Sequence, residues 1–112
     1  MSSKVFEHDY DNVQIRRFFQ DIEHSIKLIN REFISEIVGE VSRDAFVNVS
    51  KTVAKFRANY LAQVIELEKA DNISVEDIKK LRQARLMFEE AMEGFSSLQH
   101  ALTRGYFSFT GE

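Results

Sequence analysis

The feature of this sequence that most constrains its fold is the apolar pattern between Val41 and Leu67. Apolar side chains recur there every three or four positions, at Phe46, Val49, Val53, Phe56, Tyr60, Val64 and Leu67. This spacing predicts a helix with one apolar stripe. A second stripe lies beside it, formed by Val47, Ala54, Ala58, Leu61 and Ile65. Because two adjoining stripes make a wide apolar arc, we expect the central helix of a small bundle, in contact with more than one neighbour.

A long segment with the same period lies on each side of this central one. The first is predicted to be helical from about Asn12 to Val38, with a stripe formed by Ile15, Phe19, Ile22, Ile26, Ile29 and Phe33. The other is predicted from Val75 to about Thr103, with a stripe formed by Ile78, Leu81, Ala84, Phe88, Ala91, Phe95, Leu98 and Leu102. The chain has no proline and only four glycines in 112 residues, which favours long uninterrupted helices.

Capping residues mark the ends of these helices. Each predicted helix is preceded by a residue that can accept hydrogen bonds from free backbone N–H groups, namely Asp11, Ser42 and Ser74. Asp77 completes an Asp version of the capping box with Ser74. Gly39 is predicted to stop the first helix in the left-handed conformation, and Gly105 is predicted to stop the third. In the competing interpretation, Gly39 and Ser42 lie inside one very long helix.

These boundaries predict an all-α fold, an antiparallel bundle of three long helices. Residues 1–9 form a flexible N-terminal arm, residues 10–105 a single helical-bundle domain, and residues 106–112 an aromatic C-terminal tail. The short connection at 39–41 makes the first two helices antiparallel neighbours. Surplus apolar residues predict that dimerisation completes a larger bundle; these are Phe18, Ile34, Val38, Val47, Leu61 and Ile65.

Composition limits the classes of function. Without cysteine, the chain has no disulfide, thiol nucleophile or thiolate metal site. A net charge of −3 gives no long-range attraction for nucleic acid or anionic membrane. No apolar run approaches the ~20 residues of a membrane span, and the first eight residues lack the apolar core of a signal peptide. We therefore expect a cytoplasmic protein that binds neither nucleic acid nor membrane.

The three histidines are the first candidates for chemistry. His8 lies in the arm, and His24 and His100 fall on sides of their helices that face away from the stripes. The segment from His24 to Lys27 resembles the His-x-x-Lys part of histidine phosphotransfer domains. Leu28 and Ile29 stand where that family needs a glycine and a small residue, so their bulk is expected to block the partner's active site.

The spacing of Arg17 and His24 resembles the Arg-to-His motif of all-α nucleases of the HEPN type. Neither likeness extends beyond a few residues. Metal binding is not predicted, because Asp21 and His24 form a single outward-facing pair and the acidic cluster Glu89, Glu90 and Glu93 lies mostly off the stripe. No cofactor site is predicted either, and no catalytic motif is strong enough to predict an enzyme.

The function that fits best is protein–protein interaction, as a small non-enzymatic adaptor, regulator or inhibitor that forms a homodimer. The expected contact residues are Tyr106, Phe107 and Phe109 in the tail, with Leu61 and Ile65 on the central helix. In the alternative for the tail, it folds back and caps the bundle. Two further hypotheses stay open. One is phosphotransfer or RNase activity centred on His24, and the other is a structural subunit of a larger assembly.

Overall fold

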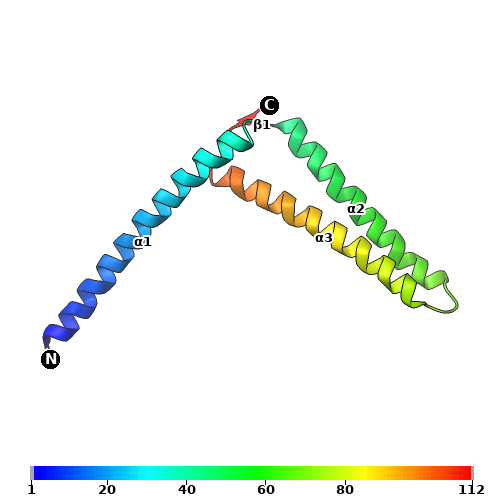
Figure 1. Ribbon diagram of the computed structural model, residues 1–112, viewed down its shortest axis with the longest axis horizontal. Coiled ribbons are helices and arrows are strands. Elements are labelled where there is room, and N and C mark those ends of the chain that lie inside the picture. Colours follow the sequence, from blue (N-terminus) through cyan, green and yellow to red (C-terminus); the bar gives the residue numbers. More distant parts are fainter. Residues whose placement is uncertain (1, 112) are drawn as a thin grey trace.

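The chain is all-α and contains three long helices in the computed structural model, which describes the backbone of residues 2–111 and the side chains of residues 12–111. Helix α1 spans Ser2–Ile37, α2 spans Arg43–Lys69 and α3 spans Val75–Thr103 (Figure 1). Two short strands, β1 at Val41–Ser42 and β2 at Phe109–Thr110, pair in parallel.

Helices α2 and α3 lie side by side as an antiparallel hairpin, and α1 projects away from the open end of that hairpin (Figure 1). The described chain is therefore V-shaped, with extents of 74 × 46 × 20 Å. Its radius of gyration is 23.2 Å, whereas a compact chain of this length has about 13 Å. Helices α2 and α3 are antiparallel, but α1 packs along neither of them in the described part of the chain, so the expected antiparallel pair of the first two helices is not present there.

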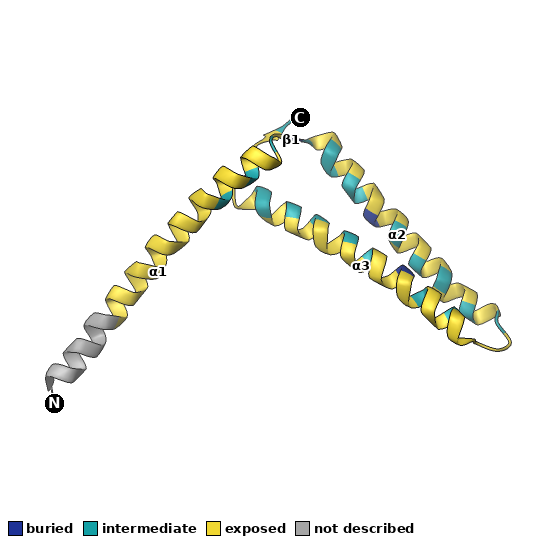
Figure 2. Cartoon of the chain, viewed as in Figure 1, coloured by how far each residue is buried: buried dark blue, intermediate teal, exposed yellow. Residues whose placement is uncertain are grey.

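The seam between α2 and α3 alternates large rings with small side chains. Val53 is 5% exposed and Ala84 is 4% exposed, so they are the most deeply buried residues of the two helices (Figure 2). The rings of Tyr60 and Phe88 stack with centroids 6.1 Å apart. The Arg57 guanidinium lies 5.2 Å from the centre of the Phe88 ring, where its charge is attracted by the ring face. The predicted stripes of these two helices thus form the core.

The predicted caps of α2 and α3 are confirmed. The backbone N–H of Ala45 donates to Ser42 Oγ at 3.1 Å. At the start of α3, the N–H of Asp77 donates to Ser74 Oγ at 3.1 Å, and the N–H of Ser74 donates to Asp77 Oδ2 at 3.0 Å. This is a complete capping box.

The predicted glycine stops are confirmed as well. Gly39 has φ +74° and Gly105 has φ +73°, a conformation in which other residues are strained. Helices α1 and α2 are therefore separate, and the interpretation as one very long helix is wrong.

The start of α1 differs from the prediction. The helix begins at Ser2 instead of Asn12, so residues assigned to the N-terminal arm have helical backbone, and Asp11 lies inside the helix instead of capping it. The physical reason is that no glycine or proline occurs before Gly39, so nothing in this stretch breaks the helix. The side chains of His8, Tyr10 and Asp11 lie outside the described residues.

Replacing Ser74 by alanine removes the cap of α3. We expect the substitution Ser74→Ala to lower the free energy of unfolding by about 1 kcal/mol, because the N–H of Asp77 loses its acceptor. Chemical denaturation followed by circular dichroism measures the change. Ser97→Ala, at an exposed position inside α3, is the control and should leave stability nearly unchanged.

The same cap predicts a dependence on acid. Hydrogen bonds from the backbone N–H and then the side chain of Ser74 lower the pKa of Asp77 below its usual value, and Lys80 adds a smaller effect in the same direction. Because the pKa of Asp77 is lowered in the folded state, its ionised carboxylate stabilises the fold. This stabilisation is present above the usual carboxyl pKa and is lost as the pH falls through the lowered pKa. Asp77→Asn should therefore lose this part of the acid dependence, which denaturation at neutral and strongly acidic pH would reveal.

Candidate functional site

Helix α1 carries an apolar stripe that no other described part of the chain covers. Its members are between 38% (Ile22) and 59% (Phe19) exposed, and Figure 2 shows α1 exposed along almost its whole described length. The stripe consists of Ile15, Phe19, Ile22, Ile26, Ile29 and Phe33. Burying side chains of this kind contributes about 1.5–3 kcal/mol each. The stripe is therefore a candidate contact surface in the described part of the molecule.

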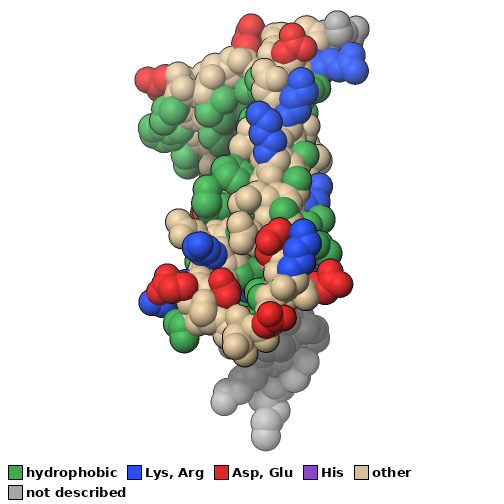
Figure 3. Space-filling model, turned by 90° about the vertical axis from the view of Figure 1, so that its right-hand side faces the viewer, with side chains coloured by type: hydrophobic (Ala, Val, Ile, Leu, Met, Phe, Trp, Pro, Cys, Tyr) green, Lys and Arg blue, Asp and Glu red, His purple; other side chains and the backbone are tan. Residues whose placement is uncertain are grey.

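A second uncovered surface lies on the hairpin. Leu61 is 53% exposed and Ile65 is 56% exposed, and both belong to the second predicted stripe of α2. The other members of that stripe, Val47, Ala54 and Ala58, are exposed too. Seen from the closed end of the hairpin, hydrophobic side chains lie open among the charged ones (Figure 3). The stripe that was expected to contact another neighbour thus has no neighbour within the described chain.

The aromatic tail folds back onto the open end of the hairpin, as the alternative interpretation predicted. Phe107 is 6% exposed, and its ring centroid lies 6.2 Å from that of Phe46. The ring of Phe109 lies 6.3 Å from Phe46 on another side and remains 45% exposed. Strand β2 pairs with β1, and the N–H of Val41 donates to the carbonyl oxygen of Ser108 at 3.0 Å. Phe107 therefore has little surface left for a partner, whereas Phe109 keeps about half.

His24 lies in an open hollow between α1 and the end of α3. Lys27 lines this hollow from the next turn of α1, and Arg104 and Tyr106 line it from the other side. Arg17 lines a separate hollow with Phe18 and its neighbours, so the structure does not bring Arg17 and His24 into one hollow. The proximity of Arg104 and Tyr106 to His24 is not predictable from local patterns, because it depends on where the end of α3 meets α1.

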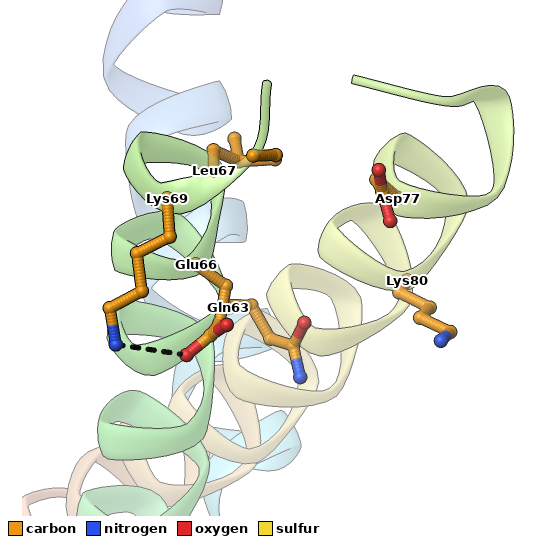
Figure 4. A pocket seen from close by; sticks show the side chains of 7 residues that line it. Gln63, Glu66, Leu67, Lys69, Asp77 and Lys80 are labelled. Carbon is orange, nitrogen blue, oxygen red and sulfur yellow. Dashed lines mark ion pairs between the residues drawn. The ribbon is translucent and has the colours of Figure 1, made fainter. Parts of the chain in front are cut away.

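The hollow at the closed end of the hairpin is open to solvent and has both polar and apolar lining residues, Leu67 among the latter. Gln63, Glu66 and Lys69 line it from α2, and Asp77 and Lys80 line it from α3 (Figure 4). Lys69 Nζ lies 3.6 Å from Glu66 Oε1, in an ion pair whose two side chains are about two-thirds exposed. Exposed pairs of this kind contribute little to stability. The hollow offers no buried group that is held in place for catalysis.

Among the described residues, no three histidine, aspartate or glutamate side chains gather where a metal ion would bind. No described helix combines the length and apolar character that crossing a membrane requires. Comparison of the chain with protein-family models, curated proteins and solved structures finds no match. The exposed apolar faces of α1 and α2 remain as candidate contact surfaces.

Removing the ring of Phe107 tests the structural role of the tail. We expect Phe107→Ala to lower the free energy of unfolding by about 3 kcal/mol, because a buried ring is lost and a cavity is left beside Phe46. Phe109→Ala is the control, with a smaller expected loss because Phe109 is already half exposed. Equal losses in urea denaturation would contradict the assignment of Phe107 as the anchor.

Proposed function

We propose that the protein is a small non-enzymatic interaction protein, an adaptor, regulator or inhibitor, which binds other helices through its exposed apolar faces. A second copy of the chain is among these partners, so the protein acts as a homodimer. The observation that supports this proposal is the uncovered stripe of α1, six large apolar residues in a row on one face of one helix. Soluble monomers seldom leave so long an apolar face in water.

The surface area supports the same proposal. The chain exposes 9306 Å², whereas a compact monomer of 13.1 kDa exposes about 6,400 Å². The excess is about 2,900 Å², and stable complexes commonly bury about 1,200–2,000 Å² over both partners. One chain therefore has more surplus surface than a standard interface needs.

The spacing of the α1 stripe indicates the kind of partner. Its residues follow one another at intervals of four, three, four, three and four positions. This is the heptad spacing with which one helix packs against another, knob into hole. Binding of a helix in a groove between helices uses the same anchor pattern. We place the interaction in the cytoplasm, which a sequence without cysteine permits.

A structural subunit of a larger assembly would use the same faces. It would differ from a regulator in stoichiometry, because a subunit binds permanently whereas a regulator also exists free. Measuring the native mass of the protein purified from its own cells distinguishes these two roles. Neither role requires the hollow beside His24.

Charges placed on the α1 stripe should abolish association. For the double variant Ile22→Glu, Ile26→Glu, we expect a native mass of 13.1 kDa in place of the twofold larger mass of the unaltered protein. The helix should persist because both positions are exposed. Light scattering after gel filtration measures the mass, and circular dichroism the helix content.

Leu28→Glu is the matched control for this variant. Leu28 is 51% exposed and lies two residues from Ile26, which turns a helix by about 200° and places it on the opposite side. The control should associate like the unaltered chain. An unaltered chain with a native mass of 13.1 kDa would contradict self-association.

A further inference from the structure

We propose that α1 docks on the second stripe of α2 in another copy of the chain, so that two chains exchange their first helices and complete each other's bundle. This inference rests on the proposed function and names its partner and contact surface. It joins two apolar faces that remain uncovered among the described residues. The antiparallel three-helix bundle predicted from the sequence would then form between chains instead of within one.

The two stripes match position by position. When α1 lies antiparallel to α2 with Ile37 level with Arg43, five of the six stripe residues of α1 come level with members of the α2 stripe. The resulting pairs are Ile15 with Ile65, Phe19 with Leu61, Ile22 with Ala58, Ile26 with Ala54, and Phe33 with Val47. In the middle, isoleucines oppose alanines, which lets the two helices approach closely. The sixth residue, Ile29, comes level with Lys51.

The same register brings opposite charges together along one edge of the interface. Glu23 comes within two residues of the level of Lys55, and Arg16 comes within two residues of the level of Glu66. Two residues correspond to about 3 Å along a helix. By helical spacing, both pairs fall on the same side of the two stripes. Within the described residues, Glu23 and Lys55 have no ion-pair partner of their own. These two pairs of opposite charges therefore favour this register electrostatically.

The joint between α1 and α2 explains why the acceptor is a second copy. From Val41 onward the chain is fixed to the hairpin, because β1 pairs with β2 and Val41 is only 8% exposed. The tail rings cover Phe46 at the end of α2 where α1 would have to turn back. Beside its stripe, α1 shares the hollow lined by Arg104 and Tyr106, to which Glu23 and Ile26 also contribute. These contacts hold α1 away from its own hairpin and leave both faces open.

Exchange of an identical element across a short hinge is an established route to dimers. Here the hinge is the stretch 38–40, which contains Gly39. Two chains that each hide about 2,900 Å² of excess surface would bury an area in the range of obligate dimers, about 2,000–5,000 Å² or more. The area available is thus sufficient for a stable pair.

Mixing two defective variants tests this arrangement without assuming its register. The donor variant, Ile22→Glu, Ile26→Glu, places charges on the α1 stripe and leaves the hairpin unaltered. The acceptor variant, Leu61→Glu, Ile65→Glu, places charges on the second stripe of α2 and leaves α1 unaltered. We expect each variant alone to have a native mass of 13.1 kDa, and an equimolar mixture to form a 1:1 pair of twice that mass. Light scattering after gel filtration gives both masses.

The other outcomes are distinct. If the acceptor variant alone still dimerises, the α1 helices pair with each other, and exchange is overturned while self-association stands. If the mixture remains at 13.1 kDa although the unaltered chain dimerises, exchange is also overturned. If the unaltered chain is itself a monomer, both this inference and the proposed homodimer fail.

Two controls guard these results. The variant Thr52→Glu, Asn59→Glu carries the same charges on the other side of the hairpin and should dimerise normally, because Asn59 points about 160° away from Leu61 around α2. Helix content by circular dichroism shows whether each variant folds. Should a double variant lose helix, the single variants Ile26→Glu and Leu61→Glu take its place, with the same pattern of masses expected.

Discussion

The packing of α2 against α3 is the contact on which the rest of the molecule depends. Phe88 and Phe95 fit between small residues such as Ala84 and Ala91, so rings from one helix reach the other without forcing the helices apart. This seam is also the only extended one between helices in the described chain. It fixes which side of α2 is occupied and which side remains free. The free stripe of α2 is therefore a consequence of the seam as much as of its own residues.

The open end of the hairpin connects this seam to α1. Phe46 contacts Phe95 within the hairpin, and it also contacts Phe107 and Phe109 of the tail. The tail in turn positions β2, which pairs with the strand that follows α1. A single aromatic cluster thus stabilises the hairpin and helps to set the direction in which α1 leaves it. The stripe of α1 thus remains exposed to solvent although Ile26, one of its members, lines the hollow shared with Arg104 and Tyr106.

Local chemistry predicted most of the helical framework. Ser42, Ser74 and the two stop glycines act through neighbours within a few positions, so their roles follow directly from the sequence. The start of α1 was not predicted from the sequence, because Asp11 resembles a cap and no nearby pattern shows that the helix extends to its N-terminal side. The β1–β2 pair was not predicted either, because a strand of two residues has no periodic pattern. Periodicity predicts an apolar stripe, but it does not show what, if anything, covers that stripe.

The pairing of Val41 with Phe109 has a consequence for the order of folding. The hairpin forms from contacts between neighbouring segments, whereas this pairing joins residues separated by both of its helices. Closing so long a loop is slower than forming local contacts. On a ribosome, α1 and α2 are synthesised before Phe109 exists, so α1 is unrestrained while the chain is being made. Its direction relative to the hairpin is set only once Phe109 has been made and can pair with Val41.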